Sequence, residues 1–172
     1  MEILIPGLIL VALMVYASTK IKRNAAKAYE EETIEREQFS LVKPEGFIEP
    51  VREENEPAFL AYTKDFGEDD AADLRIATIE VSVLPLSSIA RRREAIASSG
   101  IEILGDRSFQ IGPVPALQIE AERNLGGVDV QVKYLLAVKN SVLLELRTEL
   151  LRHREDEYKE RIERILDSFQ VT

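Results

Sequence analysis

The first group of side chains that could do chemistry is Lys64-Asp65-Phe66-Gly67, whose last three residues match the metal-binding Asp-Phe-Gly of protein kinases. In a kinase that aspartate works with a glycine-rich loop over the ATP phosphates and with a His-Arg-Asp catalytic loop. The sequence has neither motif, and 172 residues are too few for a kinase domain. We therefore assign no phosphoryl-transfer chemistry to this segment.

A run of carboxylates follows in Glu68, Asp69, Asp70 and Asp73, and oxygen ligands of this kind suit a calcium ion. An EF-hand loop, however, spaces its acidic residues and places a glycine at the sixth position, and that pattern is absent. We interpret these residues as a solvated acidic loop and predict no metal site.

The single histidine, His153, lies among Arg152, Arg154 and Glu155. A catalytic triad would need a serine and an aspartate from elsewhere, and no pattern in the sequence identifies them. We predict a solvent-facing histidine at the start of a helix. The absence of cysteine excludes disulfides, thiolate zinc sites and cysteine nucleophiles. The sequence thus predicts a protein that is not an enzyme, needs no cofactor or metal, and has no small-molecule substrate.

A basic cluster, Arg91-Arg92-Arg93, lies in the soluble region. Three consecutive residues cover most of a helical turn, so at least one of them should point to solvent. We predict a contact site for an acidic partner or for lipid headgroups. Simple solvation or salt bridging on the surface is the alternative.

Composition limits the class of partner. The chain is 45% hydrophobic, which supports a core for one domain with an appendage. Its net charge of −9 and pI of about 4.8 exclude a nucleic-acid partner, because neutralising phosphates requires a basic face. The acidity leaves room for a basic partner surface.

The elements that must position these residues follow from periodicity and turn signals. Alternating apolar residues predict strands at 39–42, 57–64, 74–84, 101–104, 107–111, 116–123, 128–138 and 142–150. The pairs Gly126-Gly127 and Lys139-Asn140 predict tight antiparallel hairpins. A helix should begin at Ser87 and end near Ser99, with Gly100 as its C-terminal cap. The fold class is therefore α+β with a mainly antiparallel sheet.

A second helix is predicted near the C-terminus, with a single apolar face in a charged stretch. That face consists of Tyr158, Ile162, Ile165, Leu166 and Phe169. We expect it to lie on the sheet.

The N-terminal segment predicts a membrane anchor over residues 1–19. Residues 3 to 19 form an uncharged stretch of 17 residues, roughly 26 Å as a helix, which approaches the ~30 Å of a bilayer core. A signal peptide is less favoured, since no Lys or Arg precedes the stretch and no convincing Ala-x-Ala cleavage site follows it. A buried core helix is the other alternative. The side chains expected to contact lipid are Ile3, Leu4, Leu8, Leu10, Val11, Leu13 and Tyr16.

A basic cluster follows the apolar stretch and is expected to contact lipid headgroups: Lys20, Lys22, Arg23 and Lys27. Only Glu2 lies on the other side, so the positive-inside rule places the soluble domain in the cytoplasm and the N-terminus outside. We expect a single-pass protein of a bacterial inner membrane. Residues 20–38 lack Gly and Pro and are rich in helix formers, which predicts a helical stalk leading to a domain at 39–172 that folds without the span.

Three segments of residues 39–171 resemble the PsbP-like superfamily, named for an extrinsic subunit of the oxygen-evolving photosystem. They are Phe39-Ser-Leu-Val-Lys-Pro-Glu-Gly-Phe47, Gly112-Pro-Val-Pro-Ala116 and Ile165-Leu-Asp-Ser-Phe-Gln-Val171. The resemblance implies an antiparallel sheet sandwiched by helices and a mostly non-catalytic role. The uncleaved N-terminal span departs from many members of that superfamily.

These observations lead to two functional hypotheses and a weaker third. The first is a non-catalytic accessory subunit, anchored in the bilayer, that stabilises or assembles an integral membrane protein complex, with photosynthetic or respiratory complexes as examples by fold analogy. The second is a cytoplasmic-face adaptor or chaperone-like binder of client proteins. A hydrolytic enzyme is the weakest, because no nucleophile, base or metal set can be named.

Overall fold

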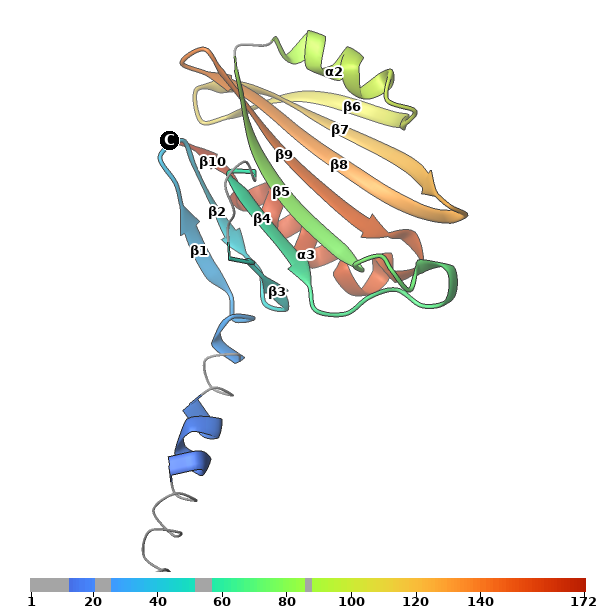
Figure 1. Cartoon of the computed structure of the whole chain (residues 1–172). Coiled ribbons are helices and arrows are strands. Elements are labelled where there is room, and N and C mark those ends of the chain that lie inside the picture. Colours follow the sequence, from blue (N-terminus) through green and yellow to red (C-terminus); the bar gives the residue numbers. More distant parts are fainter. Residues whose placement is uncertain (1–12, 21–25, 52–56, 86–87) are drawn as a thin grey trace, which may run out of the picture.

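The structure is a computed structural model that describes residues 13–20, 26–51, 57–85 and 88–172 (Figure 1). Within those ranges the chain forms a seven-stranded sheet, a three-stranded sheet and helices packed on them. The large sheet has the order β3 (Phe47–Ile48), β4 (Phe59–Thr63), β5 (Ala77–Pro85), β9 (Val142–Leu151), β8 (Val128–Lys139), β7 (Val114–Leu125) and β6 (Glu102–Ile111). The small sheet has the order β1 (Glu32–Glu35), β2 (Phe39–Lys43) and β10 (Gln170–Val171).

Every neighbouring pair of these strands is antiparallel. The helices are α2 (Ile89–Ala97) and α3 (Glu155–Ser168), with 3-10 turns η1 (Asp69–Ala71) and η2 (Arg152–Arg154). The mainly antiparallel sheet with helices is therefore confirmed. Helix α2 is capped by Ser88, whose hydroxyl accepts a hydrogen bond from the Arg91 backbone N–H, and the predicted cap Ser87 lies outside the described residues.

Both predicted hairpins are present, and the first has the predicted turn residues. Gly126 and Gly127 both have positive φ, as a type I′ turn between right-handed twisted strands requires. The second turn is shifted by one residue from the prediction. Lys139 pairs with Val142, so the two turn residues are Asn140 and Ser141, both with positive φ.

Strand β6 corrects the prediction of two separate strands at 101–104 and 107–111. It is continuous and contains a bulge, because the pairing passes from Ile103 with Ala121 directly to Gly105 with Glu120. The extra residue, Leu104, interrupts the alternation, so the pattern in the sequence looks broken although the strand is not. Strands β3 and β10 were not predicted, since two residues are too few to show a period.

The predicted helical stalk at 20–38 is wrong over its second half. Ala26 and Lys27 are helical, a turn follows, and residues Glu32–Glu35 form strand β1 against β2, with Ile34 opposite Leu41. Ile34 is only 3% exposed. Helix propensity favours a helix here, but burial of Ile34 and pairing with β2 outweigh that weak preference.

At the N-terminal end, residues 13–20 are helical and exposed. Among the residues that the structure describes, no helix has the length and apolar character needed to cross a membrane. Five of the side chains expected to contact lipid, namely Ile3, Leu4, Leu8, Leu10 and Val11, lie outside the described residues. The same is true of Lys22 and Arg23, whereas Leu13, Tyr16, Lys20 and Lys27 are described and exposed.

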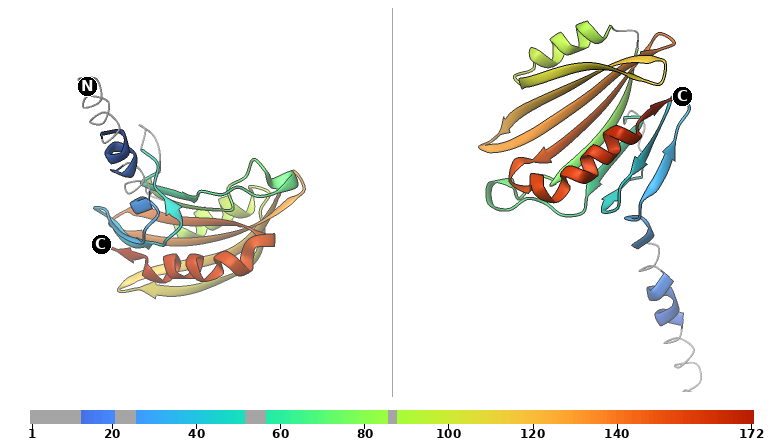
Figure 2. Two further views of the ribbon diagram at one scale, coloured as in Figure 1. Left: turned by 90° about the horizontal axis from the view of Figure 1, so that it is seen from below. Right: turned by 180° about the vertical axis from the view of Figure 1, so that it is seen from behind.

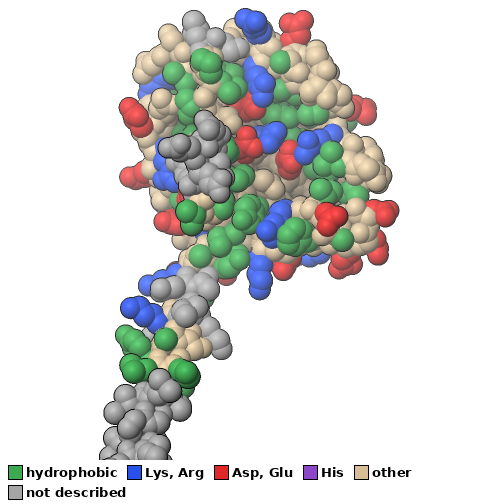
Figure 3. All heavy atoms as spheres, viewed as in Figure 1, with side chains coloured by type: hydrophobic (Ala, Val, Ile, Leu, Met, Phe, Trp, Pro, Cys, Tyr) green, Lys and Arg blue, Asp and Glu red, His purple; other side chains and the backbone are tan. Residues whose placement is uncertain are grey.

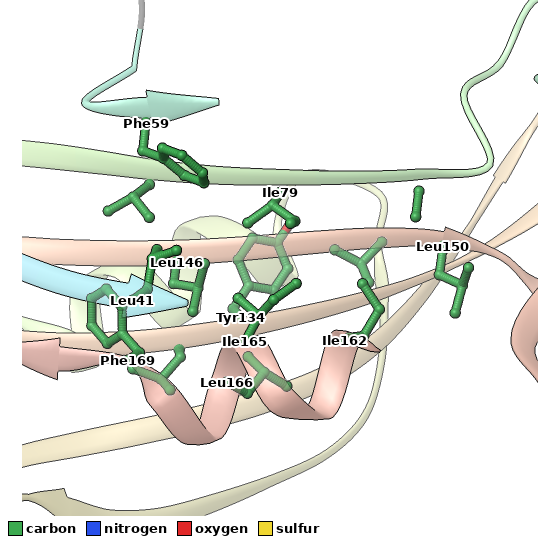
Figure 4. Close-up of a cluster of buried hydrophobic side chains, with 14 of the residues drawn as sticks. Leu41, Phe59, Ile79, Tyr134, Leu146, Leu150, Ile162, Ile165, Leu166 and Phe169 are labelled. Carbon is green, nitrogen blue, oxygen red and sulfur yellow. The ribbon is translucent and has the colours of Figure 1, made fainter. Parts of the chain in front are cut away.

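The large sheet has an inner face, covered by α3 and the small sheet, and an outer face, on which α2 lies (Figure 2). The inner face carries the main core, in which Ile79 and Leu146 from the sheet meet Ile162 and Ile165 from α3 (Figure 4). All five side chains predicted for the apolar face of the C-terminal helix are buried: Tyr158, Ile162, Ile165, Leu166 and Phe169. Helices on both faces agree with the expected sandwich.

Candidate protein-binding site

Two of the three clustered arginines of α2 form ion pairs within the domain. The Arg92 guanidinium donates to both carboxylate oxygens of Glu145 on the outer face, with Nη2 at 2.8 Å from Oε1. Glu145 is only 4% exposed, and this hydrogen bond raises the pKa of Arg92. Arg93 donates to Asp106 at 2.7 Å. Of the three arginines, Arg91 is exposed and forms no ion pair with the described residues, so within this cluster it alone is free to contact a partner.

The outer face beside α2 carries a ladder of alternating charges. Arg147 on β9 pairs with Glu80 on β5 at 2.5 Å and with Glu149 at 3.5 Å, and Glu149 also accepts from Arg123 on β7 at 2.8 Å. Burial lowers the pKa of Arg147, but Glu149 and Glu80 raise it overall. Figure 3 shows acidic and basic side chains interspersed on this face. Because these charges pair with each other, the ladder does not favour a partner of either sign.

The segment Lys64-Asp65-Phe66-Gly67 is a structural turn. Phe66 pairs with Arg75 in an isolated bridge, and the Arg75 guanidinium carbon lies 3.9 Å from the centre of its ring. A Cβ at Gly67 would lie 2.5 Å from the Cβ of Ala71 and 2.7 Å from Leu151 Cδ1, so close packing requires the glycine. Its resemblance to the kinase motif therefore has a packing explanation.

The acidic loop and the single histidine lie together, which the sequence did not predict. Glu68, Asp69 and Asp70 line a pocket of about 440 Å³ with Asp129 and the exposed His153. Over the described ranges, no group of three or more His, Asp or Glu side chains is arranged to hold a metal ion. The pocket is therefore an acidic surface feature at one end of the sheet.

A polar groove, which we call the α3 groove, lies on the inner face where α3 leaves the sheet uncovered. Figure 2 shows strands β6 to β8 beside α3 with no element over them in this view. The floor is formed by Gly105, Arg107, Gln118, Glu120 and Lys133 from these three strands. The wall is formed by Glu163, Leu166 and Asp167 of α3, and the groove has a volume of about 420 Å³.

Hydrogen bonds fix the polar groups of the floor. Arg107 Nε and Nη2 both donate to the side-chain oxygen of Gln118, at 3.2 and 2.9 Å. Because guanidinium nitrogens can only donate, this contact settles which end of the Gln118 amide is the oxygen. Leu166 is the one apolar side chain in the lining, whereas pockets for small organic ligands are mostly apolar. The groove is suited to a polar, extended ligand such as a protein segment.

No sequence pattern predicts this groove. Its residues come from three strands and a helix between positions 105 and 167, and its charged members look like ordinary residues of a solvated face. Only the packing of α3 across part of the sheet brings them together. The lining contains no serine, threonine or histidine, and no hydrogen bond among the described residues joins Lys133 to one of its carboxylates.

Comparison with known proteins identifies the fold. No family model matches the sequence, and no curated protein matches it. The structure is similar to cyanobacterial PsbP (CyanoP) from Synechocystis, with 12% identity, a TM-score of 0.62, and coverage of 84% of this chain and 94% of that one. It is also similar to LpqN, involved in cell envelope biogenesis of Mycobacterium tuberculosis, with 13% identity, a TM-score of 0.61, and coverage of 83% and 91%.

A third similar structure is the Ran-binding protein Mog1p of Saccharomyces cerevisiae, with 13% identity, a TM-score of 0.54, and coverage of 83% of this chain and 96% of that one. The common element is the PsbP-like fold, and the resemblance found in the sequence is confirmed at the level of fold. At these identities the similarity concerns the fold alone.

Proposed function

We propose that this chain is a non-catalytic accessory protein that is anchored in a membrane by its N-terminal apolar segment. In this proposal the domain binds the cytoplasmic face of a multi-subunit membrane complex, such as a photosynthetic or respiratory one, and stabilises or assembles it. Lys20 and Lys27 would lie at the headgroups with their neighbours Lys22 and Arg23.

The observation that carries this proposal is the buried side chain of Lys43, which is 1% exposed. Its ammonium donates to three backbone carbonyl oxygens, those of Ala28 at 3.2 Å, Glu30 at 2.7 Å and Phe47 at 3.0 Å. The Gly46 backbone N–H also donates to the Tyr29 carbonyl at 2.8 Å. These hydrogen bonds hold the backbone against the domain from residue 28 onward.

Because the backbone is held from residue 28 onward, only a short link joins the apolar stretch to the domain. The stretch ends at Thr19 and Ala28 is already held, so only residues 20–27 lie between them. A domain on so short a link would stay next to the bilayer and could reach only partners at the membrane surface. This geometry favours a fixed subunit over an adaptor that captures clients at a distance.

The similar structures support a binding role by analogy. One is a PsbP, one takes part in cell envelope biogenesis and one binds Ran. A shared fold does not carry a shared function, so the analogy extends only to a non-enzymatic accessory or binding role.

Co-purification tests the proposal. The tagged full chain is expressed in its source cells and isolated in mild detergent, and the recovered proteins are identified by mass spectrometry. We expect one set of membrane proteins in constant proportion. Six Gly-Ser residues inserted after Lys20 should reduce that recovery, because they lengthen the link and lie before the backbone hydrogen bonds of Ala26 and Lys27. The same residues appended after Thr172 serve as the control and should leave recovery unchanged.

Two results would count against the proposal. A set of soluble proteins that varies with growth conditions would favour the adaptor function instead. A chain recovered entirely in the soluble fraction, without membrane proteins, would rule out the anchor and with it the accessory role at a membrane.

A further inference from the structure

The C-terminal end of α3 carries charges that are unfavourable for the helix itself. Acidic residues belong at a helix N-terminus, and α3 follows this rule with Glu155, Asp156 and Glu157 in its first turn. Its last turn contains no basic residue but does contain Asp167. Glu163 lies four positions earlier, so two carboxylates repel each other on the same helix face.

Both of these carboxylates line the α3 groove. Neither forms an ion pair with any residue that the structure describes, although Lys133 and Arg107 line the same groove. No ion pair among the described residues therefore relieves the repulsion between Glu163 and Asp167. Local conflicts of this kind are expected at functional sites, where a ligand resolves them.

A second and independent observation is a donor without a partner in the described part of the chain, on a largely buried side chain of the floor. Gln118 is 8% exposed, and its side-chain oxygen is occupied by Arg107. Its Nε2 amide group therefore points the other way, and it has no hydrogen-bond partner among the described residues. Because Gln118 lines the groove, this donor is available to an acceptor that enters there.

Resting on the proposed protein-binding function, we infer that the α3 groove receives an extended segment of the partner that carries a lysine or arginine. The cation of that side chain lies between Glu163 and Asp167 and removes their repulsion. A backbone carbonyl of the same segment accepts the Gln118 Nε2 hydrogen bond. The segment thus contacts the two carboxylates and the free Gln118 donor at once.

Charge supports a basic segment over an acidic one. Three carboxylates of the lining, those of Glu120, Glu163 and Asp167, have no ion pair in the described ranges, against the single unpaired ammonium of Lys133. The Arg107 guanidinium donates to the neutral Gln118 amide and keeps its charge, so three unpaired carboxylates face two cations and leave one net negative charge. The net charge of −9 adds a long-range attraction for cations.

The test uses the full chain in mild detergent and two fluorescent ten-residue peptides, one of alternating lysine and serine and one of alternating glutamate and serine. Fluorescence anisotropy should show binding of the lysine peptide. The double variant Glu163→Gln, Asp167→Asn should weaken it about tenfold, as two exposed ion pairs near the upper end of their usual strength predict. Gln118→Leu should also weaken it, because the donor is lost.

A matched control removes the same charge elsewhere. Glu45 and Glu160 are exposed and lie outside the groove lining, so Glu45→Gln, Glu160→Gln should leave the affinity almost unchanged. The groove double variant should also melt at a higher temperature than wild type, since it removes a repulsion. Weaker binding by a more stable protein excludes unfolding as the cause.

Two outcomes would overturn the inference. Equal loss of binding in the groove variant and in the control would show that only overall charge matters. Tighter binding of the glutamate peptide would show that the groove selects the opposite sign. Neither outcome affects the co-purification result, so failure of this inference and failure of the accessory role can be told apart.

Discussion

Phe39 and Phe169 stack on each other with ring centres 5.9 Å apart and planes inclined by 25°. Phe39 is the first residue of β2, and Phe169 directly follows α3, so this contact joins the small sheet to the end of the C-terminal helix. Both side chains are 1% exposed. The stack therefore closes the inner-face core at the point where β2 meets the C-terminal end of α3.

Replacing Phe169 with alanine should destabilise the domain strongly. Removal of a buried phenylalanine costs about 3 to 5 kcal/mol, out of the roughly 5 to 15 kcal/mol that a domain of this size possesses. Urea denaturation of wild type and Phe169→Ala measures the difference. Gln170→Ala is the control, because Gln170 is exposed. A Phe169→Ala protein as stable as wild type would contradict the core described above.

Loss of Arg92 should cost stability although it lies on the surface helix α2. In Arg92→Ala, the Glu145 carboxylate would remain buried without its partner, and a lost hydrogen bond to a charged group costs about 1.5 to 3 kcal/mol. Arg91→Ala removes the same charge from an exposed side chain and should change stability little. Thermal melts of the two variants distinguish them, and equal melting temperatures would show that the Arg92–Glu145 pair contributes nothing.

A methyl group at Gly67 should be poorly tolerated. The new Cβ would meet the Ala71 Cβ and the Leu151 side chain well inside van der Waals distance. Overpacking of this kind costs about 1 to 3 kcal/mol. Gly105→Ala is the matched control, because nothing lies within 4 Å of a Cβ placed there. Denaturation midpoints provide the comparison. If Gly67→Ala has the same midpoint as wild type, the turn at Phe66 can shift to accommodate the added methyl group.

The buried Lys43 should make stability depend on pH in a defined direction. Burial lowers the pKa of Lys43 below its usual value of 10.5, although Glu32 and Glu49 oppose this. Between the lowered pKa and 10.5, the unfolded chain binds a proton that the folded chain does not, so the free energy of unfolding rises with pH. Wild type should therefore gain stability relative to Lys43→Met as the pH is raised from neutral toward 10.5.

Urea denaturation of both proteins at a series of pH values checks this. The raised pKa values of Tyr134 and Tyr158, caused mainly by burial, remove stability once the pH passes the usual tyrosine value of 10. Both tyrosines are present in both proteins, so their effect cancels in the difference. A difference that shrinks with rising pH would have the wrong sign and would refute the assignment.

Most of the large sheet could be predicted from the sequence, because its long strands alternate and end at strong turn signals such as Gly126-Gly127. The C-terminal helix was equally clear from its one apolar face. The bulge at Leu104 could not be predicted, because one extra residue disrupts the two-residue period of a strand. Periodicity therefore identified those elements that are long and regular.

The features that matter for binding were hidden for a different reason. Lys43 looked like an ordinary surface lysine, and its role depends on backbone carbonyls that carry no sequence signature. Ile34 lay in a helix-favouring segment, whose local preference was overridden by a strand partner. The α3 groove depends on where one helix crosses a sheet. Contacts between distant segments decide each of these, and a single sequence does not show them.

The boundary of the folded unit gives the last prediction. The sequence predicts a domain at 39–172 that folds without the span. A fragment that begins at Glu37 contains that range but lacks β1 and the carbonyls of Ala28 and Glu30. Loss of the buried Ile34 alone removes about 1.5 to 3 kcal/mol, and the buried Lys43 ammonium would keep only one of its three acceptors, that of Phe47. A fragment that begins at Ala26 retains all of these contacts.

We therefore expect residues 26–172 to unfold cooperatively without detergent and at a clearly higher temperature than residues 37–172. Within the longer fragment, Ile34→Ala should remove part of that advantage, while Thr33→Ala, at the exposed neighbouring position, should not. Thermal melts of the four proteins decide the matter. If the two fragments melt together, β1 and the Lys43 contacts do not stabilise the domain, and the short, fixed link to the membrane that the proposed function requires would be lost as well.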